Sequence, residues 1–412
     1  MWGLVLGLLR PGAFVSGSTK AAASSGLHAQ LVLLIAGQIC IHAAMAGMRM
    51  AAPLLAMTQG YGKASIGALV ALFAVTQIFL ALPAGRLADR HGIKRPIALS
   101  VVAASIGIGS AALWPIYPVL CFSALCSGGA HGVAVIAFQR HVSRIAVAPA
   151  QLKQAFSWLS IAPTISLFLG PFAAGLIIDS AGYQVAFLVL AALPLSTWLF
   201  VRTLQGGPQA KHPWEPVQGS AWSLWREPNF RNLLLMNALM SLSWDLHAFI
   251  VPVLGHERGL SATVIGTILA GFAIAATISR LAMPTLVRKV PEWALITASL
   301  VVAGLLFGLY PFAHSPLGMG LCSFLIGMTL GCVQPTVMVI LHQVTPHHQH
   351  GEALAIRLMM INASAVVMPL LFGSVGGLLG ASAVLWLVGV VVGTGSSLGL
   401  SLRSVERDHP KK

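Results

Sequence analysis

Charged residues are scarce in this chain, and acidic residues are the scarcest of all. Only 8% of its 412 residues are charged, while 57% are hydrophobic. A soluble domain normally carries about 25% charged residues, so this composition leaves too few polar side chains to cover a surface that faces water. A lipid bilayer removes the difficulty, because it replaces water as the solvent for most of the surface. The sequence therefore predicts an all-α polytopic membrane protein.

The signatures of enzymes and of bound cofactors are also missing. The chain has no phosphate-binding glycine loop of the Walker kind, no hydrolase elbow and no zinc-protease motif. Its five cysteines lie inside apolar runs and form no CxxC pair, which favours packing over disulfides or metal sites. We therefore expect no enzymatic activity, no metal and no cofactor. We interpret the histidine cluster at His342, His347, His348 and His350 as a polar loop and not as a metal site.

Most of the charged residues are basic, with 24 Lys and Arg against 10 Asp and Glu. The basic residues are scattered between apolar runs, which disfavours a nucleic-acid surface and is typical of cytoplasmic loops in a membrane protein. If both termini are cytoplasmic, the outer loops contain only Lys63 and Arg258. The sequence therefore predicts both termini inside, in the plasma membrane of a cell, the inner membrane in a bacterium.

Apolar runs of about 20 residues, the length that crosses a bilayer, recur twelve times. They cover 29–54, 65–85, 96–114, 117–138, 155–178, 183–202, 231–253, 264–287, 292–312, 316–341, 352–378 and 382–402. The polar segment 205–229 separates the first six from the last six and is predicted to be a cytoplasmic linker. Residues 1–28 and 403–412 are then cytoplasmic tails, and 29–204 and 230–402 are two six-helix bundles.

The two halves repeat one another at an offset of 199 residues. Pro53 falls on Pro252, Gly60 on Gly259, and the pairs continue as far as Gly132 on Gly331. A constant offset over such a length indicates two similar bundles, with a central site between them that opens to each side of the membrane in turn.

The loop after the second predicted span carries a recognisable motif. It reads Gly85-Arg-Leu-Ala-Asp89-Arg90-His-Gly92-Ile-Lys94-Arg95. This resembles the G-x-L-x-D-R-x-G-x-K/R signature of the major facilitator superfamily, at its usual place between helices 2 and 3. The resemblance covers about residues 28 to 402. It implies a transporter with twelve helices, from a family whose members are mostly monomers. It also implies a cytoplasmic gate that Asp89 locks through Arg140 or Arg144 and through the start of helix 11 near Gly351.

The fifth predicted span contains Gly170-Pro171-Phe-Ala-Ala174-Gly175, which is similar to the G-P-x-x-G-G motif of this superfamily. Small residues allow helices to approach closely, and proline bends a helix. The motif is typical of drug:proton antiporters. The chain departs from that branch at Gly128, where many proton-coupled exporters carry an arginine in helix 4, so its route of proton coupling must differ or be absent.

Two charges lie deep inside predicted spans, where an ion is expensive and a functional role is the default interpretation. They are Arg49 in the first span and Asp245 in the seventh. The resemblance places helices 1, 4, 7 and 10 around the central cavity, so we expect the two charges to face each other there, with Asp245 as the proton acceptor. The alternatives are a purely structural salt bridge, an Arg49 that reaches the outer surface, or an Arg49 that binds an anionic substrate.

Other polar side chains lie on the same four helices. His131, beside the missing arginine, is a second candidate for proton transfer. The candidates for hydrogen bonds to a substrate are Gln38, His42, Asn237, His247 and Gln334. Each can equally well be a hydrogen-bonding contact between helices.

Three functions follow from these patterns. The leading prediction is a secondary transporter that exports a small organic compound in exchange for protons. The second keeps the fold and reverses the direction, with uptake of an organic anion that Arg49 binds. The third is a membrane sensor or enzyme on a transporter fold. Hypersensitivity to a toxic compound after gene deletion would indicate the first, and loss of growth on a nutrient the second.

Overall fold

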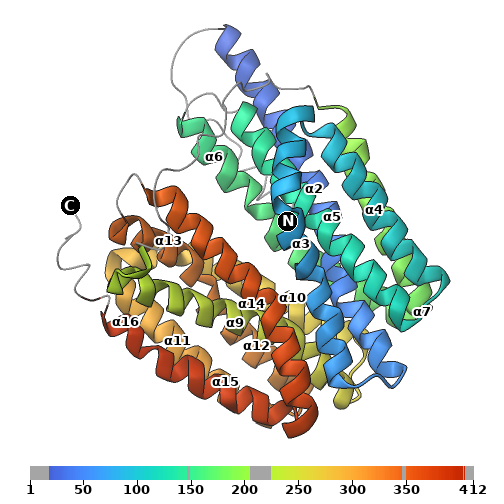
Figure 1. The fold of residues 1–412 in the computed structure, drawn as a ribbon, viewed down its shortest axis with the longest axis vertical. Coiled ribbons are helices and arrows are strands. Elements are labelled where there is room, and N and C mark those ends of the chain that lie inside the picture. Colours follow the sequence, from blue (N-terminus) through green and yellow to red (C-terminus); the bar gives the residue numbers. More distant parts are fainter. Residues whose placement is uncertain (1–17, 146–148, 205–223, 346–348, 402, 404–412) are drawn as a thin grey trace.

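The computed structural model describes residues 18–145, 149–204, 224–345, 349–401 and 403, and all regular structure in these ranges is helical (Figure 1). The helices are α2 (Ser18–Thr58), α3 (Lys63–His91), α4 (Lys94–Leu113), α5 (Tyr117–Ile145), α6 (Pro149–Leu159), α7 (Ile161–Arg202), α9 (Pro228–Glu257), α10 (Ala262–Lys289), α11 (Glu292–Leu309), η1 (Tyr310–Phe312), α12 (Pro316–Gly331), α13 (Val333–Val344), α14 (His350–Leu379), α15 (Ala381–Gly395) and α16 (Ser397–Ser401). Most of the predicted linker and the histidines His347 and His348 lie outside the described residues.

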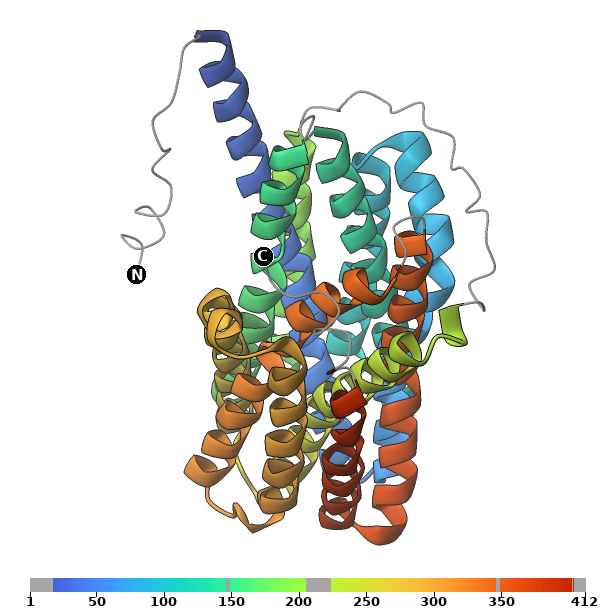
Figure 2. The ribbon, with the colours of Figure 1, turned by 90° about the vertical axis from the view of Figure 1, so that its left-hand side faces the viewer.

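Eleven helices of the described residues are long and apolar enough to cross a membrane. One of them, Gln154–Arg202, is 49 residues long and reverses at Gly182, whose φ of 84° and ψ of 171° are not helical. That helix therefore crosses twice, and the twelve predicted spans are confirmed with boundaries that shift by a few residues. The first helix starts at Ser18, within the predicted tail, and its first turns project beyond the other helices (Figure 2).

Large apolar side chains cover the outside of the bundle. Leu281 is 77% exposed, Leu317 84% and Leu378 86%. In water each such side chain would forgo about 1.5–3 kcal/mol of burial free energy, and many more leucines, valines and isoleucines share this exposure. Contact with lipid tails removes this cost, so the surface confirms the membrane environment that the composition predicts.

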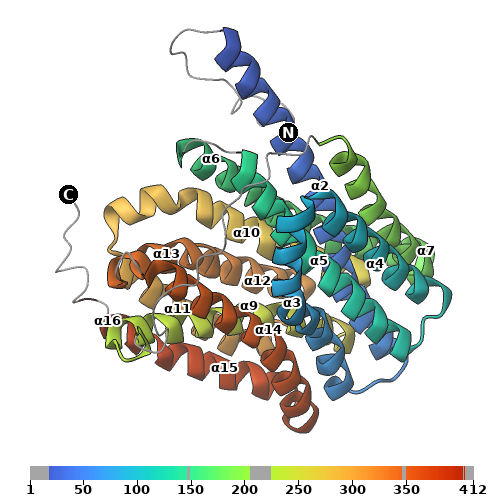
Figure 3. The ribbon, with the colours of Figure 1, turned by 45° about the horizontal axis from the view of Figure 1, so that its top comes forward.

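The helices form two groups. Those from α2 to α7 lie on one side of Figure 1 and those from α9 to α16 on the other, and Figure 3 shows the same separation from a second direction. Within each group neighbouring helices pack in pairs such as α3 with α5 and α10 with α12. The exact domain boundaries, and the linker between them, stay a prediction.

The sequence repeat is visible in atomic contacts. A Cβ added to Gly128 of α5 would collide with the carbonyl oxygen of Phe73, and one added to Gly327 of α12 would collide with the carbonyl oxygen of Phe272 at 2.4 Å or nearer. Each residue of the second pair follows its counterpart by 199 positions. The same close helix approach is therefore built twice, which is the geometry expected of two related halves.

The turns define two ends of the bundle. Gly60, Gly182, Gly259 and Gly380 all have positive φ values between 68° and 85° and join successive helices at one end, which we call the Gly60 end. Positive φ is a conformation that glycine adopts at no steric cost. The opposite end carries Asp89 and is called the Asp89 end.

The two groups of helices touch through glycines near the Gly60 end. Gly67 of α3 lies against the carbonyl of Pro369 and the backbone of Gly373 in α14. In the related position, Gly266 of α10 lies against the carbonyl of Pro171 in α7. At these positions helix backbones pack without intervening side chains, which maximises van der Waals contact where lipid removes the hydrophobic drive.

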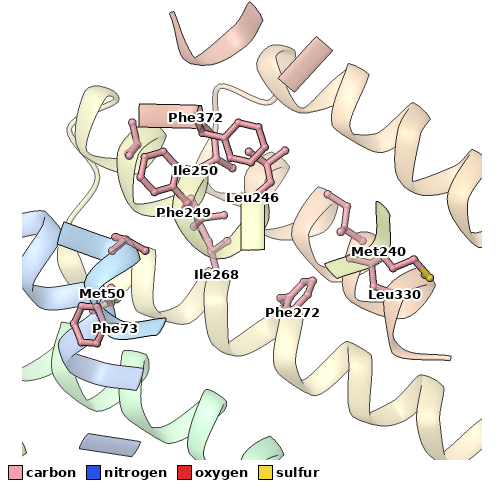
Figure 4. Packing of buried hydrophobic residues seen from close by; sticks show 14 of the residues in the cluster. Met50, Phe73, Met240, Leu246, Phe249, Ile250, Ile268, Phe272, Leu330 and Phe372 are labelled. Carbon is pink, nitrogen blue, oxygen red and sulfur yellow. The ribbon is translucent and has the colours of Figure 1, made fainter. Parts of the chain in front are cut away.

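A buried apolar cluster continues from these contacts toward the centre of the molecule. Phe249 and Ile250 of α9 lie beside Phe372 of α14, and Phe272 projects from α10 (Figure 4). All four side chains are at most 6% exposed. This cluster fixes α9 and α14 against each other at the base of the cavity described below.

The glycine contacts predict a position-dependent effect within one helix. Gly266→Val places a side chain against the carbonyl of Pro171, whereas Gly271→Val enters open space on the same helix. We expect Gly266→Val to destabilise the protein by about 1–3 kcal/mol, the usual range for an overpacked contact. Thermal unfolding of the purified variants in detergent measures the difference, and equal melting temperatures for the two variants would refute this account of the interface.

Candidate functional site

A central cavity lies where the two groups of helices meet, with an empty volume of about 620 Å³. Its walls come from α2, α7, α9 and α10. Met45 and Met50 of α2, Leu167 of α7 and Trp244 and Phe272 of α9 and α10 make most of the wall apolar. Polar atoms enter it from only a few side chains, so each of them has a large influence on what can bind.

The two predicted membrane charges meet beside this cavity. Nη2 of Arg49 donates a hydrogen bond to Oδ1 of Asp245 over 3.3 Å, and the pair joins α2 to α9. The side chain of Asp245 is 10% exposed and that of Arg49 is 26% exposed. The pair thus connects the two groups of helices through one largely buried ionic contact.

Three predicted histidines lie around the pair. The ring of His42 in α2 stacks on that of His131 in α5, with centroids 4.2 Å apart. The ring of His247 in α9 stacks on Phe272 at 4.1 Å. His42 and His247 line the central cavity, and Nδ1 of each lacks a hydrogen-bond partner among the described residues. These nitrogens are buried, so in this conformation they are polar groups without a partner among the described residues.

The remaining predicted polar residues divide into two cases. Asn237 and Gln334 do not line the central cavity. Each instead accepts a hydrogen bond from Arg357 of α14, from Nε to Asn237 Oδ1 over 3.1 Å and from Nη2 to Gln334 Oε1. Gln38 is 3% exposed and lies one turn of α2 before His42, away from the residues that line the cavity.

Arg357 is the site residue that the sequence interpretation missed. It lies five residues after Glu352, near the start of the predicted span 352–378, where a charged side chain is ordinary. In the structure it is only 6% exposed and points between α9, α13 and α14. The signal that marks it is an arginine within the apolar run of α14 with no acidic residue in the following turns.

Asp89 lies near both arginines that were predicted as its gate partners, at the Asp89 end, and the gating role stays a prediction. Oδ1 of Asp89 accepts a hydrogen bond from Nη2 of Arg144 over 3.3 Å and lies 3.8 Å from Nη1 of Arg140. Gly85 is buried beside Arg140, and Gly92 ends α3 with a φ of 69°. Arg90 is exposed. The motif therefore forms an ionic cluster within the first group of helices.

The motif Gly170–Gly175 of the fifth predicted span lies in α7 and contacts two other helices. At Gly170 an added Cβ would lie 2.5 Å from the carbonyl oxygen of Ala43 in α2, and at Gly175 it would collide with the carbonyl of Ala262 in α10. Pro171 lies between them and lines the central cavity. The motif thus holds α7 close to one helix of each group.

The fourth predicted span is α5, and the arginine that many proton-coupled exporters carry there is absent for a steric reason. Gly128 of α5 packs against the backbone of Phe73 so closely that even one Cβ would collide with it. An arginine at this position requires the separation of α3 and α5. Any proton route in this chain therefore uses other residues.

Comparison with known proteins agrees with this architecture. The profile of the Major Facilitator Superfamily matches residues 34–237 and 233–412. The chain belongs to the major facilitator superfamily. It is thus a secondary transporter family member and not an enzyme, as the motifs predicted.

Two curated relatives have names that refer to multidrug resistance. The chain is 26% identical over 319 residues to the multi-drug resistance efflux pump PmrA of Streptococcus pneumoniae, which covers 75% of this chain and 78% of PmrA. It is 25% identical over 341 residues to the multidrug resistance protein MdtG of Yersinia enterocolitica, over 78% and 80% of the two chains.

Solved structures share the fold at low identity. The nucleoside transporter NupG superposes with a TM-score of 0.73 at 17% identity, over 92% of this chain and 99% of NupG. A bacterial homologue of the human lysosomal transporter Spinster, in an inward-facing and unoccupied conformation, gives 0.75 at 13% identity over 94% and 99%. These likenesses establish the fold and leave the substrate open.

The ionic pair predicts a non-additive effect on stability. Arg49→Gln leaves the carboxylate of Asp245 without its cation in a site of low exposure, and such a change costs about 3–5 kcal/mol in a dry interior. We expect a marked fall in melting temperature for this variant and partial recovery in the double variant with Asp245→Asn. Additive losses in thermal unfolding would show that the two side chains do not interact.

Proposed function

We propose that this protein exports a small organic compound in exchange for protons, by alternating access between two six-helix halves. The Asp89 end then faces the cytoplasm together with both termini, in the plasma membrane, and the protein acts as a monomer. The basic loops at that end support this orientation, and the name of PmrA, an efflux pump, supports export.

The ion pair of Arg49 and Asp245 is the observation that carries the proton coupling. It is the single ion pair of the described residues that lies beside the central cavity, and it joins helices of the two groups. A proton on Asp245 removes the negative charge that holds Arg49, so the contact between the halves weakens at that moment. Proton binding and movement of the halves are then the same event, as exchange transport requires.

The observed conformation fits the inward-facing step of this cycle. At the Gly60 end the halves are joined by the glycine contacts and by Asp179, which accepts hydrogen bonds from the backbone nitrogens of Ala262 and Thr263 over 3.0 and 2.7 Å. An anion at a helix N-terminus is favourable. Lys63 and Glu257 add an ion pair of 2.6 Å there. Asp89, by contrast, bonds within the first half, which leaves the other end free to separate.

The alternative of anion uptake with Arg49 as the clamp receives less support. Arg49 already has Asp245 as its counter-ion, so a substrate anion would have to compete with a carboxylate that is fixed nearby. His42 and His247, which line the central cavity, are the candidate hydrogen-bonding partners for a substrate in either direction of transport.

Asp245→Asn tests the coupling. The amide keeps the shape of the side chain and cannot carry the exchanged proton, so we expect gradient-driven transport to fall by about two orders of magnitude or more while the compound still binds. Transport is measured in liposomes with and without a pH gradient, across a panel of compounds. Glu227→Gln is the matched control, because it removes an exposed carboxylate at the start of α9 and leaves the cavity and the contacts between the halves unchanged. Full gradient-driven transport by Asp245→Asn would contradict the proposal.

The gate predicts unequal effects from its two arginines. The Arg144 side chain is 10% exposed and directly bonded to Asp89, while that of Arg140 is 50% exposed and 3.8 Å away. An exposed pair contributes little, so Arg144→Gln should slow transport more than Arg140→Gln, by about tenfold against about twofold. Initial rates in liposomes give the comparison, with substrate affinity unchanged in both variants; the reverse order would refute the assignment.

A further inference from the structure

A second cavity, with an empty volume of about 850 Å³, lies between the two groups of helices on the side of the Asp89 end. It is an open cavity lined by α7, α10, α13 and α14 and by Ser160, which directly precedes α7. Its polar side chains are Ser160, Thr164, Thr277, Arg280, Gln334 and Arg357. Hydroxyl, amide and guanidinium groups provide many hydrogen-bond donors in this wall, and no acidic side chain takes part in it.

The two arginines of this cavity have no carboxylate partner among the described residues. Arg357 is held by the neutral amide oxygens of Asn237 and Gln334, which fix its orientation without cancelling its charge. Arg280 places its guanidinium carbon 5.7 Å from the ring centre of Trp244, an attractive contact that also leaves the charge in place. Both residues lie in membrane-spanning helices, where an uncompensated cation is expensive.

Trp244 connects this cavity to the central one. Its ring is under Arg280, lies in edge contact with Phe272 at 4.6 Å, and lines the central cavity. A molecule with an apolar body and an anionic end therefore finds both of its requirements in two neighbouring cavities, whose walls meet where Arg280 contacts Trp244. The apolar body contacts Trp244 and Phe272, and the anionic end contacts the arginines.

We propose that Arg280 and Arg357 bind the anionic group of an amphiphilic substrate, such as a carboxylate, sulfonate or phosphate attached to a ring system. Guanidinium groups present paired N–H donors that match the oxygens of such groups. The hydroxyls of Thr164 and Thr277 lie in the same wall and complete the donor set. This inference rests on the proposed transport function and names the substrate class that the pathway accepts.

The test uses three naphthalene probes of the same size and different charge. These are 2-naphthalenesulfonate, the neutral 2-naphthalenemethanol and the cationic 2-naphthyltrimethylammonium. Their binding to the purified full chain in a neutral detergent is measured by calorimetry. We expect the sulfonate to bind about tenfold or more tightly than the alcohol, and the cation to bind most weakly. Equal affinity for the three probes, or a preference for the cation, would overturn the proposal.

Substitutions localise the effect. Arg280→Gln and Arg357→Gln should each weaken the sulfonate about tenfold and change the affinity for the alcohol less than about twofold. Arg231→Gln removes an exposed arginine from α9 and serves as the matched control, with no effect on any probe. If the sulfonate binds equally well to all three variants, its site lies elsewhere and the proposal fails.

Two further measurements remain decisive if Arg357→Gln does not fold. Inorganic sulfate should displace the sulfonate from the unmodified protein, whereas displacement by phosphatidylglycerol alone would identify a lipid headgroup site and contradict the proposal. Asp245→Asn should still bind the sulfonate. A variant that keeps this binding and also keeps gradient-driven transport refutes the proposed proton coupling and leaves the anion site intact.

Discussion

A charge in the membrane must be compensated, and the way this chain compensates each of its few charges determines the rest of its structure. Arg49 and Asp245 neutralise each other beside the central cavity. Asp179 is stabilised by the backbone nitrogens of α10, and Asp89 by two arginines of its own half. Three of the chain's few carboxylates thus lie at contacts on which the position of a helix depends. Only Arg280 and Arg357 face a cavity without an acidic partner among the described residues.

Close glycine contacts between helix backbones accompany these ionic contacts where the halves meet. Gly67 and Gly266 allow helix backbones to meet directly at the Gly60 end, in positions related by the 199-residue repeat. Such a contact has no side chain to adjust gradually, so it is either formed or separated. Packed interfaces of this kind are bistable, and in the proposed cycle a single proton on Asp245 shifts the balance between the two arrangements of the halves.

Most of the fold follows from the sequence, because a bilayer fixes both the length and the composition of a crossing helix. The twelve spans, the repeat and the proximity of Arg49 to Asp245 were all readable from apolar runs and symmetry. The side of each helix that faces the cavity could not be read from the sequence in this way. Asn237 and Gln334 lie on the expected helices, yet they face Arg357 and not the central cavity. Helices that are apolar all round carry little periodic signal about which side faces inward. Arg357 lies near the start of the predicted span 352–378, where a charged residue does not stand out.

The glycine at position 128 changes where proton chemistry can act. An arginine in α5 would act within the first half, but the carbonyl of Phe73 excludes any side chain there. The charges that remain near the cavity belong to α2 and α9, one in each group of helices. A proton taken up inside one half must be communicated to the other through packing, whereas a proton on Asp245 acts on the contact between the halves itself. In the proposed cycle the absence of an arginine at position 128 does not remove coupling, because there the pair of Arg49 and Asp245 links protonation to the relative position of the halves.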